Sequence, residues 1–228
     1  FTPFEQKSSL VNLLALVFKP MLYREIFRLI FVYKQKISFG LLKEIFAFYS
    51  RSIITKHFLQ QVILEQKIDT NNLLIYSYWM VESSFAAAIL KQELPQVKVI
   101  ARAHSLDVYF DRSPVKYHPF RKYIFNQLNK LYFISANARS YFASVHGVSG
   151  DKMQKTTISR IGIESAAKFI EQYPAEILRV ISVGYIQKLK RIDLLVDTLA
   201  LIDDIQIEWV HVGHSNHNET DFLNIQKY

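Results

Sequence analysis

Short apolar segments alternate with helical segments from residue 73 onward, and this alternation constrains the fold more than any other feature of the sequence. The apolar segments are rich in β-branched and aromatic residues, as strands are, and the segments between them carry apolar residues at helical spacing. Near-continuous apolar strands joined by helices are typical of parallel sheets, because parallel strands need a crossover connection. The alternation therefore predicts an α/β architecture with a doubly wound parallel sheet and helices on both of its faces.

The expected elements can be placed by residue range. Strands are expected at 73–79, 97–104, 130–135, 155–162, 179–186 and 205–213. Helices are expected at 83–93, 119–129, 136–145, 191–202 and from 218 onward. Between Ile163 and Leu178 the chain is polar at both ends and has Pro174 just before a strand, which is typical of a domain junction. The sequence thus predicts two domains, at 1–165 and 179–228.

Residues 1–60 carry much of the net charge of +8, since nine Lys or Arg stand there against three acidic residues. Apolar residues recur there at three-to-four spacing, which predicts amphipathic helices. Charged residues interrupt every apolar run before it reaches the roughly 20 residues that a transmembrane helix needs. Two interpretations remain open: residues 10–60 lie on an anionic membrane surface, or the helices pack on the domain and their cations are solvated.

Composition and motifs exclude several classes of protein. Half of the residues are hydrophobic, as in a folded globular protein, and the absence of cysteine excludes disulfides and thiolate metal sites. The six glycines form neither a dinucleotide-binding G-x-G-x-x-G nor a Walker A loop, and G-x-S-x-G is missing. The imidazoles of His211, His214 and His217 could suggest a metal site, but no carboxylate or Cys partners match them, so a solvated loop is favoured.

The candidate functional residues follow the ends of the predicted strands, where open α/β sheets bind ligands. His104 follows one strand, with Arg102 two residues before it and Asp107 three residues after it. An imidazole held by a carboxylate could orient a substrate hydroxyl, although a packing role for this His stays open. Lys188, Lys190 and Arg191 begin a helix and could neutralise a diphosphate, although a solvated basic turn is the alternative.

Several segments, in their order along the chain, resemble the glycosyltransferases of family 4, which have the GT-B fold of two Rossmann-like domains. RVISVGYIQKLKRIDLLVDTLALI (179–202) resembles the opening of the donor domain, and EWVHVGHSNHNETDFLN (208–224) resembles its next strand and glycine turn. VKVIARAHSLDVY (97–109) resembles the strand and His loop of the acceptor-side domain. FISANARSYF (133–142) and TISRIGIES (157–165) resemble later segments of that domain.

The resemblance implies roles for individual residues. Lys190 would contact the leaving diphosphate, with Arg191, standing where a glycine is usual, as a further cation. Gly184 and Gly213 would be turn glycines near the nucleotide, and His104, with Asp107, would lie near the reacting sugar. The remaining expected cleft residues are Arg102, Arg160 and Gly162. Tyr185 stands where Arg is common and Arg160 where Asn is common, and the family's Glu-x7-Glu element is absent and expected beyond Tyr228.

The resemblance further implies a hexosyltransferase that moves a sugar from a nucleoside-diphosphate sugar to a glycan or lipid-linked acceptor in cell-surface polysaccharide synthesis. No metal or other cofactor and no nucleic acid partner is expected. The location would be cytoplasmic, peripheral at the inner face of the cell membrane. A chain holding the acceptor-side domain and only the opening of the donor domain would be inactive by itself. The alternative is a non-catalytic basic α/β module that binds anionic glycan, lipid or nucleic acid.

Overall fold

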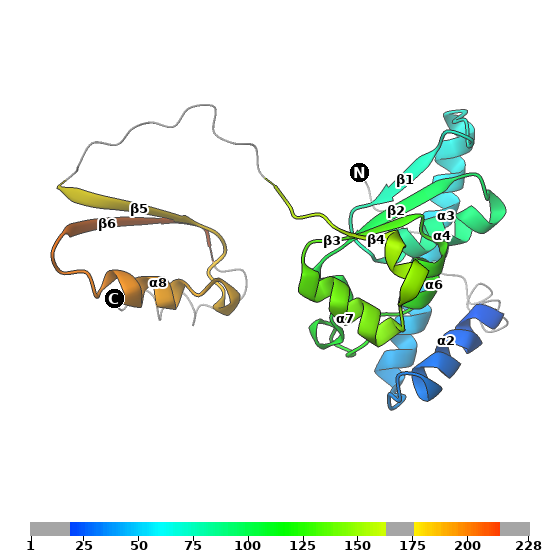
Figure 1. Cartoon of the computed structure of the whole chain (residues 1–228), viewed down its shortest axis with the longest axis horizontal. Helices are drawn as coiled ribbons and strands as arrows, with labels where there is room; N and C mark the ends of the chain where they lie inside the picture. The colour runs from blue at the N-terminus through cyan, green and yellow to red at the C-terminus, as the bar shows by residue number, and fades with distance from the viewer. Residues whose placement is uncertain (1–18, 163–175, 215–228) are drawn as a thin grey trace. The chain divides into compact units, whose positions relative to one another are not determined.

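The computed structural model describes residues 19–162 and 176–214 (Figure 1). The chain divides into two compact units, residues 1–163 and residues 164–228, and each is described here by itself. Each unit contains a sheet whose described strands are all parallel. The predicted α/β class with parallel strands is therefore confirmed.

Unit 1 is built on a four-stranded sheet in the order β1-β2-β3-β4. Its strands are β1 (Leu74–Ser77), β2 (Lys98–Ala103), β3 (Lys130–Phe133) and β4 (Thr156–Ile158). The connections contain α4 (Glu82–Glu93), α5 (Ser105–Val108), η1 (Phe110–Arg112), α6 (Arg121–Gln127), α7 (Ala136–His146) and η2 (Gly150–Lys155). All four strands are shorter than predicted, because the residues that follow each of them leave the sheet for the loops at its carboxyl edge.

Helices cover one face of this sheet. On β2, Val99, Ala101 and Ala103 are buried, whereas the alternate residues are only partly covered or exposed. The strand order has no reversal, so right-handed crossovers place the connecting helices on the same side. The predicted covering of both faces is therefore not seen in residues 19–162. The consecutive order corresponds to one half of a doubly wound sheet.

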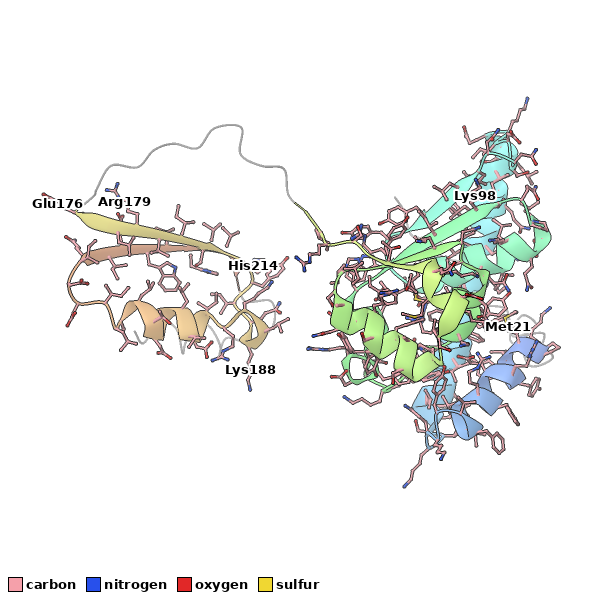
Figure 2. The ribbon with its side chains drawn as sticks, in the orientation of Figure 1. Met21, Lys98, Glu176, Arg179, Lys188 and His214 are labelled. Atoms are coloured by element: carbon pink, nitrogen blue, oxygen red, sulfur yellow. The ribbon has the colours of Figure 1, made fainter. Side chains whose placement is uncertain are left out.

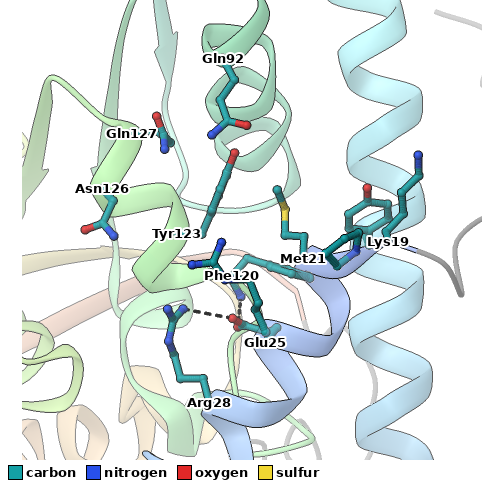
Figure 3. A pocket seen from close by; sticks show the side chains of 12 residues that line it. Lys19, Met21, Glu25, Arg28, Gln92, Phe120, Tyr123, Asn126 and Gln127 are labelled. Carbon is teal, nitrogen blue, oxygen red and sulfur yellow. Dashed lines mark hydrogen bonds and ion pairs between the residues drawn. The ribbon is translucent and has the colours of Figure 1, made fainter.

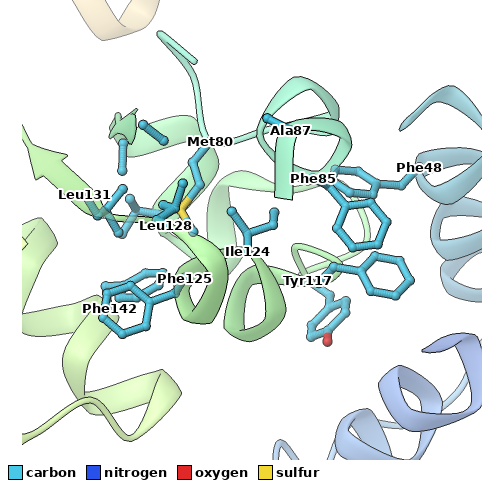
Figure 4. Close-up of a cluster of buried hydrophobic side chains, with 14 of the residues drawn as sticks. Phe48, Met80, Phe85, Ala87, Tyr117, Ile124, Phe125, Leu128, Leu131 and Phe142 are labelled. Carbon is cyan, nitrogen blue, oxygen red and sulfur yellow. The ribbon is translucent and has the colours of Figure 1, made fainter. Parts of the chain in front are cut away.

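The core of unit 1 lies between this face and its helices (Figure 4). Phe85 of α4 stacks on Phe120 with ring centroids 4.4 Å apart, and Phe125 and Phe142 meet edge to face at 5.5 Å. Met80, from the loop after β1, is fully buried in the same cluster. Aromatic side chains bury large areas, so this cluster is the main apolar contribution to the stability of the unit.

Between residue 19 and the first strand the structure describes two helices, α2 (Pro20–Phe31) and α3 (Phe39–Glu65). Helix α3 packs against α4 through a buried face that includes Leu41, Ile45 and Phe48. Two of its three cations are paired with acidic residues: Arg51 lies 2.7 Å from Glu82, and Lys56 lies 2.6 Å from Glu93. Helix α3 therefore packs on the domain through this face, and two of its cations form ion pairs on the protein.

Glu25 fixes α2 to the rest of unit 1 through a buried network. Its Oε1 accepts hydrogen bonds from the Tyr117 hydroxyl, at 2.6 Å, and from the backbone N–H of Phe120. Its Oε2 lies 3.3 Å from the guanidinium of Arg28. Burial raises the pKa of Glu25, against the lowering effect of these partners. Figure 3 shows this carboxylate at the wall of a cavity of about 460 Å³ that Arg28 and Tyr123 also line.

His146, at the end of α7, is a buried histidine. Its Nδ1 lies 2.7 Å from the Tyr33 hydroxyl, and its Nε2 is buried without a hydrogen-bond partner among the described residues. Burial, together with the positive charges of Arg121 and Lys122, lowers the pKa of His146 to about 3. The ring is therefore neutral in the folded protein at neutral pH, and protonation would place a charge in the core.

Acid is accordingly expected to destabilise unit 1 through His146. The pKa of this side chain is depressed in the folded state, so the unfolded chain binds the proton first. The stability contributed by the neutral ring is complete above pH 6.5 and falls as the pH drops from 6.5 towards 3, by up to about 1.4 kcal/mol per pH unit. Urea unfolding measured across this range should show a shallower pH slope for His146→Gln than for the unchanged protein.

The matched control is His57→Gln, because His57 is exposed on α3. This variant should keep the slope of the unchanged protein. An equal slope for His146→Gln and the unchanged protein would show that other groups govern the acid response.

The described part of unit 2, residues 176–214, contains a parallel pair of strands and one α-helix. The strands are β5 (Ile177–Val183) and β6 (Gln206–Val212), and between them lie η3 (Lys188–Lys190) and α8 (Ile192–Leu199). Inward residues such as Val180 and Trp209 are half-buried, whereas Ile181 and Val183 on the other face are more than 70% exposed. The helix predicted from 218 onward lies outside the described residues.

Candidate functional site

The carboxyl edge of the unit 1 sheet is organised by Asp107. One carboxylate oxygen accepts the backbone N–H of His104 at 2.5 Å, and the other accepts the backbone N–H of Met80 at 2.6 Å. Asp107 is buried, and it thereby joins the loop after β1 to the loop after β2. Both oxygens act as acceptors, which is the pattern of an ionised carboxylate. The predicted catalytic carboxylate is thus engaged with the protein backbone.

Arg121, which sequence reasoning missed, supplies the charge that balances Asp107. Its Nε donates to the backbone oxygen of Asp107 at 2.9 Å, and its guanidinium lies 5.6 Å from the ring centre of Phe48. Burial lowers the pKa of Arg121 and raises that of Asp107, and the attraction between the two opposes both shifts. The sequence signals no such pair, because Arg121 lies 14 residues after Asp107 at the start of α6.

His104 lies between the two loops and is more enclosed than predicted. Its ring stacks on Trp79 with centroids 4.0 Å apart, and its Nε2 lies 3.1 Å from the backbone oxygen of Tyr78. A residue that acts on a substrate in a cleft is expected to be partly exposed, but only 6% of the surface of His104 is exposed. The reason is that the aromatic residues after β1 fold over the imidazole. The role predicted for His104 at a reacting sugar stays a prediction.

Arg102 lies on the open face of the sheet. Its Nε donates to the Tyr76 hydroxyl at 3.1 Å, and its two terminal nitrogens contact the backbone oxygen and the hydroxyl of Ser159 at 2.7 and 3.1 Å. The guanidinium therefore joins β1 and β2 to the chain after β4. Tyr76, Tyr78 and Trp79 are each between 39% and 47% exposed near it. This edge thus combines a fixed cation with partly exposed aromatic side chains.

Arg160 and Gly162 follow β4, and both are exposed. A Cβ added at Gly162 would meet no atom within 4 Å, and its backbone conformation does not require glycine. These two residues lie at the end of unit 1. Their local structure does not explain why an arginine and a glycine stand at these positions. Their proposed part in a substrate cleft stays a prediction.

Gly184 and Gly213 meet at the carboxyl edge of unit 2. A Cβ added at Gly213 would lie 1.7 Å from the backbone oxygen of Gly184, so no side chain fits there. Gly184 has φ of 155°, a conformation that side-chain-bearing residues rarely adopt. The nearby His211 has both ring nitrogens engaged, with the Ser182 hydroxyl at 2.8 Å and the Gly184 backbone oxygen at 3.0 Å. Only at Gly184, where an added Cβ would meet no atom within 4 Å, does the strand end present bare backbone to a ligand; at Gly213 that space is filled by the Gly184 carbonyl.

The basic turn Lys188–Arg191 begins beyond the same edge and leads into α8. Lys188, Lys190 and Arg191 are all exposed. Arg191 is the residue that precedes the helix, has φ of 51°, and places its Nε 3.4 Å from Asp193. Figure 2 shows Lys188 and His214 at this end of the unit and Arg179 at the other end. An exposed basic turn at a helix N-terminus has the charge and the orientation to receive an anion.

No metal centre is formed by the residues that the structure describes, since no group of three His, Asp or Glu side chains is close enough together to hold an ion. His217, one of the three histidines weighed in the sequence, lies outside those residues. His211 is already engaged on both nitrogens.

Comparison with known proteins gives no family for this chain: no family model matches it, and no curated protein matches its sequence. The two edges described above and the order of the sequence segments are therefore the features that bear on function.

Proposed function

We propose that this chain is part of a glycosyltransferase that transfers a hexose-type unit from a nucleoside-diphosphate sugar to a glycan or lipid-linked acceptor in cell-surface polysaccharide synthesis. The observation that carries the proposal is the edge of unit 2, where bare backbone at Gly184 is followed along the chain by the basic turn Lys188–Arg191. A diphosphate can approach backbone closely where no Cβ intervenes, and the turn and helix N-terminus supply positive charge.

On the donor side, the reaction mainly requires positive charge next to the leaving diphosphate. Glycosyl transfer leaves a nucleoside diphosphate whose negative charge grows as the bond to the sugar breaks, and cations positioned there stabilise that charge. Lys190, with Arg191 beside it, is proposed for this task. Neither a metal ion nor a redox cofactor is part of the proposal.

The acceptor is proposed to lie at the edge of unit 1. Exposed aromatic rings such as Trp79 and Tyr78 offer apolar faces with polar tips, which suit the mixed surface of a sugar. Arg102 is held in place by Ser159 and Tyr76 beside them. His104 is proposed to act beneath Trp79, and the location proposed for the protein is the cytoplasmic side of the cell membrane.

The test is Lys190→Ala in the protein expressed from its complete gene and supplied with a panel of nucleoside-diphosphate sugars. Loss of one charge-assisted contact, of about 1.5–3 kcal/mol, is expected to lower kcat/KM at least about tenfold. Most of the loss is expected in kcat, because the charge develops in the transition state. Steady-state kinetics with the preferred donor measure both constants.

Arg179→Ala is the matched control, since Arg179 is an exposed cation at the amino end of β5, away from the basic turn. This control should keep the kinetics of the unchanged enzyme. Unchanged kinetics for Lys190→Ala would remove Lys190 from the site, and the absence of turnover with every donor sugar would count against the glycosyltransferase itself.

A further inference from the structure

Helix α2 has an apolar face that the other described residues of the chain leave open. Its inward face is formed by Leu22, Glu25 and Leu29, all buried. Tyr23, Phe27 and Phe31 recur four residues apart on its outer face and are between 55% and 63% exposed. The rings of Phe27 and Phe31 lie 4.3 Å apart, so they form a continuous apolar ridge along the helix.

This arrangement differs from that of an ordinary surface helix, which turns one apolar face inward and a polar face to water. In α2 the buried and the exposed faces are both apolar. The ridge extends beyond the helix through Val32, and Ile37 and Phe39 that follow are also exposed. Contiguous exposed apolar surface of this kind marks a site of contact with another apolar phase.

Positive charges border the ridge. Arg24 and Arg28 lie one turn apart on the flank between the ridge and the body of unit 1, and they line a shallow hollow together with Tyr23, Phe27 and Val32. Lys19 precedes the helix, and Lys34 and Lys36 follow it. From residue 19 to residue 43 the only acidic side chain is Glu25, which is buried. The charge around the ridge is therefore complementary to a surface of phosphate groups.

We propose that the outer face of α2 docks on an anionic lipid bilayer, with the helix axis parallel to the membrane plane. Tyr23, Phe27 and Phe31 enter the boundary between headgroups and acyl chains, as aromatic residues of interfacial helices do. Arg24 and Arg28 contact lipid phosphates from the flank. Among the described residues no helix is both long and apolar enough to cross a membrane.

Packing on the domain and contact with an anionic membrane are the two interpretations of the amphipathic pattern, and in this proposal α2 does both. Helix α3 uses its apolar face for packing against α4, whereas α2 packs through one apolar face and presents a second one. The proposal stands on α2 alone. It does not depend on the glycosyltransferase assignment, although it would hold that enzyme next to a lipid-linked acceptor.

The test is sedimentation of the full chain with vesicles of phosphatidylcholine, with and without phosphatidylglycerol. We expect binding to the anionic vesicles that weakens as salt is added, because the attraction of exposed charges is screened. The double variant Phe27→Ala, Phe31→Ala should lower the partition coefficient at least about tenfold, through lost apolar burial. Arg24→Gln should lower it about fivefold, the effect of one cation near an anionic surface.

Phe58→Ala is the matched control, because Phe58 is an exposed phenylalanine of α3 in the same unit. It should bind vesicles as the unchanged chain does, and circular dichroism should show that all variants are folded. Absent or equal binding to the two kinds of vesicle would overturn the proposal. So would unchanged binding of the double variant, which would assign the contact to residues 1–18, or self-association through the ridge without vesicle binding, which would assign the face to a second copy of the chain.

Discussion

Replacing Asp107 by asparagine is expected to destabilise unit 1 by about 1–3 kcal/mol, the usual cost of leaving a buried N–H donor without an acceptor. The amide cannot accept from both Met80 and His104, because one of its two positions is itself a donor. The buried guanidinium of Arg121 would also lose its counter-charge. Urea unfolding followed by the fluorescence of Trp79, which stacks on His104, measures the change.

Asp111→Asn is the matched control, since Asp111 is an exposed aspartate in the short turn η1, four residues further along. Its effect on the free energy of unfolding should be within about 0.5 kcal/mol of zero. The comparison also separates a structural from a catalytic role for Asp107. If Asp107→Asn keeps the stability of the unchanged protein but abolishes sugar transfer, the carboxylate acts in the reaction, and the structural role inferred from its hydrogen bonds is wrong.

Replacing Gly213 by alanine is expected to destabilise unit 2 by about 3 kcal/mol or more. Its Cβ would lie 1.7 Å from the backbone oxygen of Gly184, and overpacking against backbone cannot be relieved by a change of rotamer. The carboxyl ends of β5 and β6 must separate, which weakens the pairing that forms the unit. A two-stranded unit has few other contacts to compensate for this loss.

The two tryptophans of the chain make this measurement selective. Trp79 belongs to unit 1 and Trp209 to unit 2, where its indole N–H donates to the Ser182 hydroxyl at 2.9 Å. In a Trp79→Phe background, the fluorescence of Trp209 therefore follows unit 2 alone. Gly162→Ala is the matched control and should be close to neutral, because no atom lies within 4 Å of the added Cβ. Coincident unfolding curves for Gly213→Ala and the unchanged unit would contradict this prediction, because they would show that the strand ends separate without a loss in the free energy of unfolding.

The type and the order of the elements of both units could be predicted from the sequence, because they follow from the local spacing of apolar residues. A strand forms at each of the six predicted places, although the predicted ends extend too far at 78–79, 134–135, 159–162 and 184–186, and β5 begins two residues earlier than predicted. Those residues continue the apolar pattern after the chain has left the sheet. Periodicity therefore located the strands, but the point where hydrogen bonding between strands stops depends on the neighbouring strand.

The candidate residues follow from the rule that open α/β sheets bind ligands at the carboxyl ends of their strands. The residues that surround each candidate could not be predicted in this way. Gly184 and Gly213 are 29 residues apart in the sequence, yet their backbones are in contact. Asp107 was paired with His104 in the sequence because the two are neighbours. Its further partners are Met80 and Arg121, 27 residues before it and 14 after it, and through Met80 the carboxylate joins two loops.

The sequence by itself determined that the chain forms parallel α/β units and that the described part of its basic first 60 residues forms amphipathic helices, since these properties follow from local patterns of apolarity and charge. Only the tertiary structure decided what covers each surface. The stacking of Trp79 buries His104, α4 covers the apolar face of α3, and the ridge of α2 is left open. The physical reason is that burial depends on which distant segments pack together, whereas periodicity shows only that a face is apolar and not what lies against it.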